Sequence, residues 1–408
     1  MKTKQLNKPE LLAPAGDLAR AKTAIRYGAD AVYIGGRSFS LRSRASNFTY
    51  DDIREICAFA REYGAHVHVT VNIIPHDEDL DGLAEYLGFL QECGVHAVIC
   101  ASPYIMNCAK KYAPHLEVHC STQLSVTNSS AVRFLKRHLD IDRVVLAREC
   151  TMEDVRRITA EGGVPSEAFI HGGMCVNYSG RCTLSNRMTL RDANRGGCAQ
   201  SCRWQYHLYQ GKTELTKQDD LFTMGSRDLM CLDHLYDLME AGVASFKIEG
   251  RMKTEFYIAS VVSVYRRCID EILLKGGPLD ADRMRMYREE MRKSENRDIW
   301  TGFYDNPDAQ NSIIYHPNTN VDVNHDFLGT VLSYDKTAET AVIQTRNPFA
   351  KGERAEILSP SGTYEPFVFE WMKNDKGEYM EISRHPMAEV TIPMPSAVKA
   401  GDMIRRSR

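Results

Sequence analysis

The chain has 408 residues, enough for two domains or for one barrel-sized domain with an appendage. With 43% apolar and 26% charged residues, its composition is that of a folded globular protein and excludes a disordered or fibrous one. The net charge of −3 excludes a globally basic nucleic-acid binder, so any contact with nucleic acid must be local.

No stretch of the sequence predicts a membrane or secretory segment. The N-terminal run MKTKQLNKPELLAPAG lacks the apolar centre of a secretory signal, and no run approaches the roughly 18 apolar residues of a membrane span. We therefore expect a cytoplasmic protein without membrane contact. Thiols stay reduced in the cytoplasm, so clustered cysteines there are more often ligands than disulfides.

Short β-rich runs alternate with helical patterns from Glu10 to about Leu274. The eight strand candidates are residues 10–16, 31–36, 66–72, 96–100, 117–123, 143–147, 167–172 and 245–251. Between them, stretches such as 51–64 and 84–94 carry apolar residues at three- and four-residue steps and end at glycine. Residues 1–275 are thus predicted to form a (β/α)₈ TIM-type barrel. A doubly wound sheet is the alternative, but the run APAGDLARA lacks the three glycines of a dinucleotide fingerprint.

Three strand candidates alternate polar and apolar residues, namely 66–72, 117–123 and 245–251. The polar face of the last one holds Lys247, Glu249 and Arg251. A strand covered by helices has no exposed face, so we expect these polar residues to point into the barrel. Their charges then either pair with one another or face a cavity at the carboxyl ends of the strands, where barrel active sites form. We favour the cavity.

Four cysteines lie close together in the long connection after the seventh strand candidate, residues 173–226: Cys175, Cys182, Cys198 and Cys202. Long connections in such barrels are usually functional, and this one belongs on the face above the cavity. The spacing C-x6-C-x15-C-x3-C lacks the C-x2-C pairs of zinc ribbons. It favours an iron–sulfur cluster and leaves zinc open. Cys231 is the alternative fourth ligand.

The surroundings of the cysteines are basic. Between Val176 and His207 there are five arginines and one acidic residue, Asp192, which predicts either a solvated loop or a local anion-binding surface. His171, four residues before Cys175, is a candidate zinc ligand or Cys/His catalytic partner, or an ordinary histidine at a strand end.

The C-terminal third differs in pattern. Residues 276–325 read as a helical and irregular connector, and residues 326–408 as a small antiparallel β-barrel. Its strand candidates, separated by turn signals, are 327–334, 338–346, 353–360, 364–373, 377–383 and 388–394.

The run EAFIHGGMCVNYSGRC resembles the signature of the collagenase-like peptidase family U32. ELLAPAG, GADAVYIGG, VHCSTQLSVTN, GGCAQSCRW and SFKIEGRMK resemble further motifs of this family in the same order, so the resemblance covers nearly the whole chain. Members that resemble this chain are implicated in hydroxylation with an iron–sulfur cluster, on ribosomal RNA cytidine or on ubiquinone precursors among other substrates. The chain resembles the prephenate-dependent tRNA uridine hydroxylase type, which makes 5-hydroxyuridine at the wobble position.

The resemblance implies a [4Fe–4S] cluster on Cys175, Cys182, Cys198 and Cys202. It also implies prephenate as co-substrate, tRNA as substrate and a paralogous family member as a candidate partner. We expect Arg148, Gln123 and Arg251 to bind the dicarboxylate. The expected catalytic residues are Glu249, in proton transfer, together with Lys247 and His171.

An anticodon loop presents an unstacked base, which proteins hold by stacking and by phosphate contacts. The residues expected to supply these contacts are Arg181, Arg187, Arg191, Arg195, Arg203 and Trp204. The basic tail, with Arg405, Arg406 and Arg408, is a further candidate for RNA contact, or simply solvated.

Two other functions stay open. A U32-type peptidase would lack both the HExxH and the GxSxG motif, and a thiol mechanism through Cys175 and His171 would leave three cysteines unexplained. A zinc-stabilised RNA-binding module without catalysis is the third hypothesis.

Overall fold

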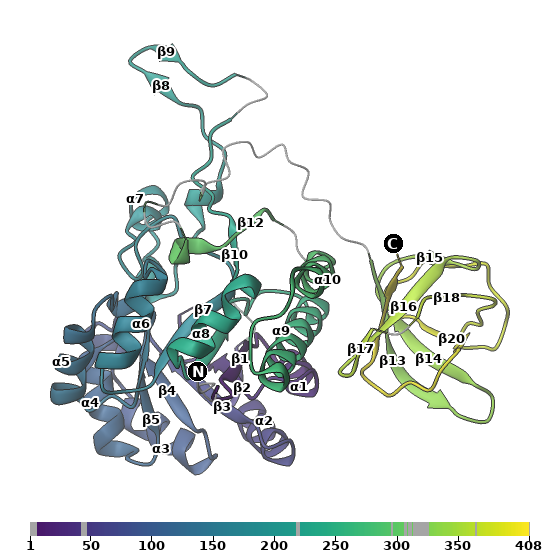
Figure 1. Cartoon of the computed structure of the whole chain (residues 1–408), viewed down its shortest axis with the longest axis horizontal. Helices are drawn as coiled ribbons and strands as arrows, with labels where there is room; N and C mark the ends of the chain where they lie inside the picture. Colours follow the sequence, from purple (N-terminus) through teal and green to yellow (C-terminus); the bar gives the residue numbers. More distant parts are fainter. Residues whose placement is uncertain are drawn as a thin grey trace.

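A computed structural model describes residues 6–41, 47–217, 221–294, 297–305, 308, 312, 326–363 and 365–407. Eight parallel strands form a ring surrounded by helices, and a separate antiparallel β region lies beside it (Figure 1). The strand order is β11-β1-β2-β3-β4-β5-β6-β7, and β7 pairs in parallel with β11 to close the ring. The predicted (β/α)₈ architecture is confirmed.

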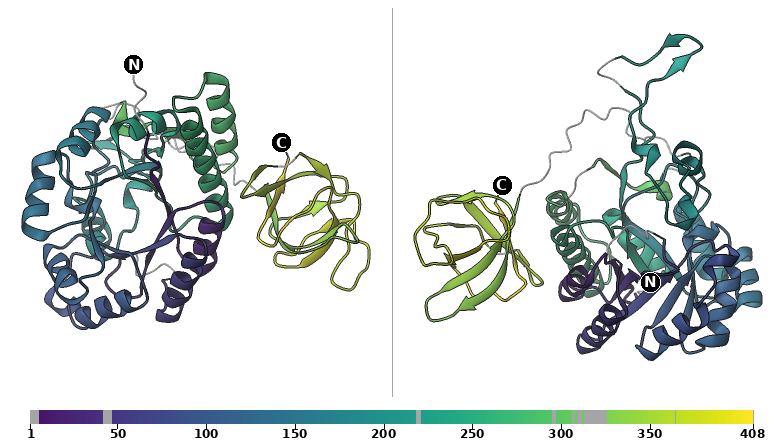
Figure 2. Two further views of the ribbon diagram at one scale, coloured as in Figure 1. Left: turned by 60° about the horizontal axis from the view of Figure 1, so that its bottom comes forward. Right: turned by 180° about the vertical axis from the view of Figure 1, so that it is seen from behind.

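The barrel strands are β1 (Glu10–Pro14), β2 (Ala31–Gly35), β3 (His66–Val71), β4 (Ala97–Cys100), β5 (Glu117–Cys120), β6 (Arg143–Val145), β7 (Ser166–Gly172) and β11 (Ser245–Ile248). The surrounding helices are α1 (Leu18–Arg26), α2 (Tyr50–Glu62), α3 (Leu83–Glu92), α4 (Pro103–Tyr112), α5 (Ser129–Leu139), α6 (Met152–Glu161), α8 (Leu235–Ala241) and α9 (Glu255–Lys275) (Figure 2). Each of the eight predicted barrel strands begins within one residue of an observed one.

Local sequence fixes where the helices begin. At α2, Thr49 accepts a hydrogen bond from the backbone N–H of Asp52 at 3.1 Å, while the Asp52 carboxylate accepts one from the backbone N–H of Thr49 at 2.8 Å. Thr151 and Asp154 form the same capping box at α6. Each such cap stabilises its helix by about 1 kcal/mol.

The interior of the barrel is polar at its amino-terminal end. Arg143 lies 2.5 Å from the carboxylate of Glu10 and 3.2 Å from that of Glu167, and the Lys247 ammonium lies 2.7 Å from Glu167. Although burial opposes ionisation, His68 and Arg143 outweigh it and lower the pKa of Glu10 to about 2. The inward direction of the polar residues was predicted. At this end of the barrel the charged side chains pair with one another, which is the alternative to a cavity that the sequence analysis considered.

The chain between β7 and β11 contains elements that the sequence did not predict. After the cysteine segment comes a strand, β10 (Asp228–Met230), which pairs antiparallel with β7. A further strand, β12 (Ile299–Trp300), pairs with β10. Before β10, the cysteine segment contains α7 (Leu184–Thr189) and a hairpin of β8 (Tyr209–Gln210) and β9 (Thr213–Glu214), which projects away from the barrel (Figure 1). Strands of two or three residues are too short to show a period.

After the barrel, α10 (Ala281–Arg292) packs on α9, and much of the following connector lies outside the described residues. The C-terminal region is a seven-stranded antiparallel sheet. Its strands are β13 (Phe327–Asp335), β14 (Thr340–Thr345), β16 (Arg354–Ser359), β17 (Gly362–Thr363), β18 (Phe367–Val368), β20 (Glu389–Pro393) and β21 (Met403–Arg406). A separate pair consists of β15 (Phe349–Ala350) and β19 (Ile382–Ser383).

Arg405 joins the C-terminal region to the barrel region and does not form a solvated tail. Its side chain is buried and contacts Glu356 at 2.6 Å and Glu290 of α10 at 2.5 Å. The expected RNA contact by Arg405 is therefore wrong, because two carboxylates already hold its guanidinium inside the protein. Arg408 lies outside the described residues.

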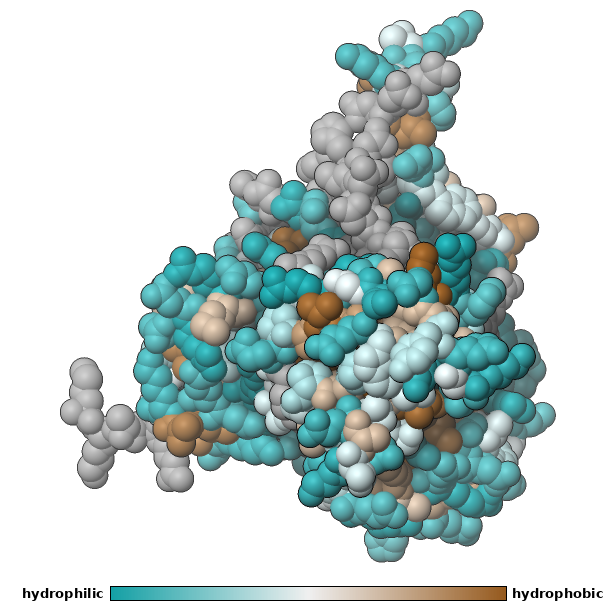
Figure 3. Space-filling model, turned by 90° about the vertical axis from the view of Figure 1, so that its right-hand side faces the viewer, coloured by the Kyte–Doolittle hydropathy of each residue, from teal (hydrophilic) through white to brown (hydrophobic). Residues whose placement is uncertain are grey.

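The surface is ordinary for a folded protein. The face shown in Figure 3 is mostly hydrophilic, with apolar residues scattered over it. None of the helices in the described part of the chain combines the length and hydrophobicity that a bilayer span requires.

Candidate active site

The segment with the four cysteines lies against the carboxyl ends of the barrel strands. Two glycines with positive φ make the close approach: Gly172 (φ 101°) and Gly180 (φ 73°). A Cβ at Gly172 would lie 2.1 Å from the carbonyl oxygen of Glu249, just beyond β11, and one at Gly180 would lie 2.0 Å from that of Gln123, just beyond β5. Only glycine satisfies both constraints at these positions. The segment is therefore held over the barrel mouth.

The four thiols share one electrostatic environment. Desolvation raises the pKa of Cys202, and the negative charges of Cys175, Cys198 and Cys182 add to this rise. The pKa of Cys175 is likewise raised by desolvation, with Cys198 and Glu249 adding to it. Cys175 is nevertheless exposed to solvent.

Cys231 lies apart from this group. It is completely buried in the hydrophobic core, directly after β10, and burial raises its pKa well above the usual value. Its backbone N–H donates to the carbonyl of Ile170 on β7. This placement favours Cys202 over Cys231 as the fourth ligand.

The chemistry of the four thiols fits a metal group that accepts soft, anionic sulfur ligands. Desolvation and the charges of the neighbouring thiols raise the pKa values of Cys175 and Cys202, and a bound metal cation would offset that rise. Asn177 already donates to the sulfur of Cys182 at 3.1 Å, as a partner that orients a ligand does. Among the described residues, no three His, Cys, Asp or Glu side chains form a group that could hold a metal ion.

Arg148 and Glu249 form the charged floor beneath the cysteines. Their side chains approach to 4.0 Å, and the Arg148 guanidinium lies 3.8 Å from the centre of the Phe169 ring. Tyr33 donates to a Glu249 carboxylate oxygen at 3.1 Å. The Nε of Arg148 is buried without a hydrogen-bond partner in the described structure. Both charges also act on Cys175, so this pair and the cysteine belong to one site.

Lys247 and Arg251 lie deeper than predicted. Lys247 is buried beside Glu167 and lies 4.6 Å from the centre of the Tyr33 ring. Arg251, 6% exposed, donates to Ser40 at 3.2 Å and to Thr70 at 3.1 Å. Both residues therefore hold the barrel and its loops in place, and neither lies open to a substrate as the sequence had suggested.

Gln123 has a similar positioning role. Its carbonyl oxygen accepts from the Asn72 amide at 2.7 Å and from Ser121 at 3.1 Å, and its own amide donates to the Asn72 carbonyl at 3.1 Å. The side chain thereby joins the loops after β3 and β5, directly under Gly180.

His171 faces away from the barrel mouth. The register between β7 and β11 shifts after Phe169, so that His171 pairs with Ile248 and shares its outward direction. Its ring is buried against α9, with Nδ1 3.2 Å from the hydroxyl of Tyr265. Burial, with the charge of Lys253, lowers the pKa of His171 to about 3. The predicted catalytic role of His171 has no support in this geometry.

The residues predicted to bind RNA do not form one continuous surface. Arg195 contacts Asp79 at 2.8 Å and Glu78 at 3.3 Å, so its charge is largely compensated. Arg203 turns inward, donating to the Met174 carbonyl at 3.2 Å. The remaining residues of the set lie exposed or half-buried on the cysteine segment: Arg181, Arg187, Arg191 and Trp204.

Two features of the site escaped sequence reasoning. Tyr33, which donates a hydrogen bond to Glu249, lies in the apolar run of β2, so its sequence context predicts an ordinary core residue. Asp228 gathers cations from three separate segments, and no local pattern predicts such a contact.

Comparison with known proteins places the chain among relatives. The model of peptidase family U32 matches residues 16–314, and that of the peptidase family U32 C-terminal domain matches residues 323–405. The chain is 41% identical over 406 residues to tRNA hydroxylation protein P1 of Bacillus subtilis, covering 98% of this chain and 95% of that protein.

Two further relatives carry different names. The 23S rRNA 5-hydroxycytidine synthase of Escherichia coli is 40% identical over 272 residues, which are 66% of this chain and 40% of that protein. A collagenase of Porphyromonas gingivalis is 34% identical over 312 residues, which are 73% of this chain and 74% of that protein. Since the two family matches together span nearly the whole sequence, this chain belongs to peptidase family U32.

Proposed function

We propose that this chain hydroxylates RNA, converting the wobble uridine of tRNA to 5-hydroxyuridine with prephenate as co-substrate. The observation that carries the proposal is the meeting of Cys175 with Arg148, Glu249 and Arg203 at the carboxyl end of the barrel, where barrel enzymes place their active sites. The relatives add support, since one is named for tRNA hydroxylation and another for making 5-hydroxycytidine, a pyrimidine hydroxylated at the same position.

In this proposal Cys175, Cys182, Cys198 and Cys202 hold a [4Fe–4S] cluster. When bound, such a cluster would supply electron-transfer chemistry beside the target base. The protein's own part is to bind, orient and move protons.

Each charged residue of the floor has a distinct task. Arg148, with its buried Nε free of a described partner, binds a carboxylate of the co-substrate. Glu249 accepts the proton released from the base, and Tyr33 holds its carboxylate in place. Lys247, Arg251 and Gln123 act as positioning residues, since their polar groups already contact the protein.

The anticodon loop would approach from the cysteine segment. Trp204 and Tyr178 are 44% and 48% exposed, and each offers a ring on which a base can stack. Arg181 and Arg187 lie exposed on the same segment and can contact phosphates. A tRNA substrate agrees with the cytoplasmic location expected from the sequence. Pairing with a paralogous family member stays a prediction.

The peptidase alternative lacks its base. A Cys175 thiol protease needs a histidine beside the sulfur, whereas the His171 ring packs against Tyr265 on the other side of the strand. The zinc-module alternative differs from the proposal in metal content and in having no reaction product.

Mass spectrometry of tRNA nucleosides from a strain lacking the gene tests the proposal. We expect 5-hydroxyuridine and its derivatives to fall in that strain and to return with the wild-type chain but not with Cys198→Ser. Unchanged 5-hydroxyuridine after removal of this gene and of any paralogue would refute the tRNA substrate.

A further inference from the structure

A group of cations surrounds one buried carboxylate at the start of β10. Asp228 lies 3.3 Å from Arg297, 3.7 Å from Lys253 and 3.9 Å from Arg203. Among the residues that the structure describes, one negative charge thus faces three positive charges. Asp228, Arg203 and Lys253 are largely enclosed by protein, and Arg297 is 32% exposed. An excess of positive charge away from bulk water is unfavourable unless an anion compensates it.

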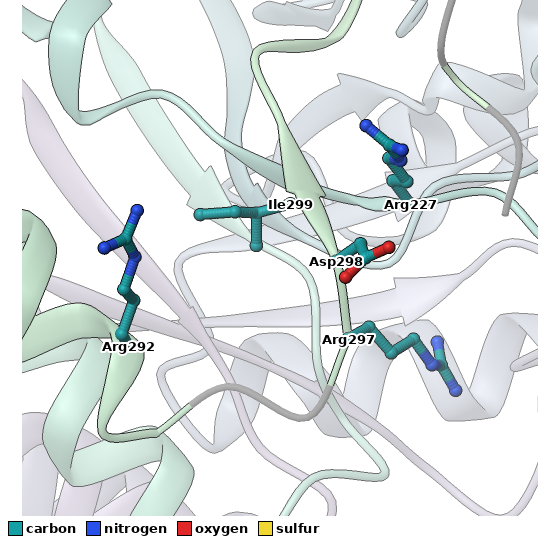
Figure 4. A pocket seen from close by; sticks show the side chains of 5 residues that line it. All are labelled: Arg227, Arg292, Arg297, Asp298 and Ile299. Carbon is teal, nitrogen blue, oxygen red and sulfur yellow. The ribbon is translucent and has the colours of Figure 1, made fainter. Parts of the chain in front are cut away.

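A pocket of about 530 Å³ adjoins this group and shares Arg297 with it. Its other lining residues are Arg227, Arg292, Asp298 and Ile299, which gather around β12 (Figure 4). The Nε of Arg227 is buried and has no hydrogen-bond partner in the described structure. The pocket therefore adds two arginines and one carboxylate to the Asp228 group, leaving a larger excess of positive charge.

We infer that this pocket, together with the cations around Asp228, binds backbone phosphates of the RNA substrate. Arginine forks match phosphate oxygens, and the lining is almost wholly charged. Pockets that bind small metabolites are mostly apolar. Among the described residues that line this pocket, only Ile299 is apolar. Such a charged lining suits the phosphate backbone of a nucleic acid better than a small metabolite.

The site is continuous with the candidate active site. Arg203 contacts Asp228 on one side and donates to the Met174 carbonyl, next to Cys175, on the other. A phosphate held here would fix the strand beside the cysteines and Glu249, so that the target base can enter the mouth. The inference rests on the proposed function, because it names the RNA contact of that same site.

Salt-dependent binding of an unmodified tRNA transcript, measured by fluorescence anisotropy with the full chain, tests the inference. A plot of log affinity against log salt concentration falls with a steepness of about 0.7–0.9 for each phosphate contact. The double variant Arg227→Gln/Arg292→Gln should therefore make this plot less steep by about 1.5. Arg285→Gln is the matched control, since Arg285 is an exposed arginine of the same helix as Arg292 and lies outside the pocket lining. Asp298→Asn removes a negative charge from the lining and should tighten binding.

An unchanged slope in the double variant, or looser binding by Asp298→Asn, would overturn the inference. Arg292→Gln alone, at an exposed side chain, gives the same test with a slope change of about 0.8 if the double variant does not fold. The two proposals can fail separately. If tRNA hydroxylation is absent while the slopes change as expected, the phosphate site stands and the reaction does not; if hydroxylation is found with unchanged slopes, only the phosphate site is refuted.

Discussion

Replacing Glu249 by glutamine separates a catalytic carboxylate from a structural one. The amide keeps the size of the side chain and an oxygen that can accept the Tyr33 hydroxyl, now 3.1 Å away, but it loses the charge that faces Arg148 at 4.0 Å. The two side chains are 12% and 18% exposed, and at 4.0 Å they stand at the limit of an ion-pair contact, so losing the charge costs about 1–3 kcal/mol of stability. We therefore expect Glu249→Gln to fold, with a modest loss of stability.

The expected effect on catalysis is much larger. Loss of a general base lowers the rate by about 10²–10⁴-fold, equivalent to about 3–5 kcal/mol of activation free energy. The assay is the rate of 5-hydroxyuridine formation in a tRNA transcript, with Glu85→Gln, at an exposed position on α3, as the control. A rate within threefold of the wild type for Glu249→Gln would refute the assignment of Glu249 as the proton acceptor.

Three further predictions follow from buried or clustered groups. Cys202→Ala should lose bound iron while Cys231→Ala keeps it, as measured by iron content after anaerobic purification; the reverse result would exchange the two as ligands. Lys247→Met should lower the free energy of unfolding by about 3 kcal/mol, because it leaves the buried Glu167 carboxylate without its ammonium, and adding Glu167→Gln should restore part of that loss in urea denaturation. Burial lowers the pKa of His68 to about 4, whereas a histidine in the unfolded chain has a pKa of ~6.5. The free energy of unfolding is therefore unaffected by His68 above pH ~6.5, and it falls by up to about 3 kcal/mol as the pH drops towards 4, because only the unfolded chain takes up the proton readily. His68→Gln should show a weaker loss of stability over that range, and an equal loss would contradict the buried neutral ring.

The alternation of strands and helices was predictable because each barrel strand pairs with the next barrel strand along the chain and several helices, among them α1, α2, α5, α6 and α9, carry their own N-caps. The positions of β10 and β12 were not, since two or three residues show no period and their pairing depends on β7, far away along the chain.

Within the site, the sequence identified the cysteines, Arg148 and Glu249 as residues of one region, and the structure brings them together. It could not show that Lys247 and Arg251 are already engaged, because their partners Glu167, Ser40 and Thr70 belong to other strands and loops. The outward turn of His171 arises from a one-residue register shift, which reverses the direction of a side chain without any signal in local composition.

The most direct test of the central claim is the iron and acid-labile sulfide content of the wild-type chain after anaerobic purification. The four-cysteine site predicts about four iron and four sulfide per chain for a [4Fe–4S] cluster, with broad visible absorption. A colourless protein that contains one zinc per chain and no sulfide would contradict it.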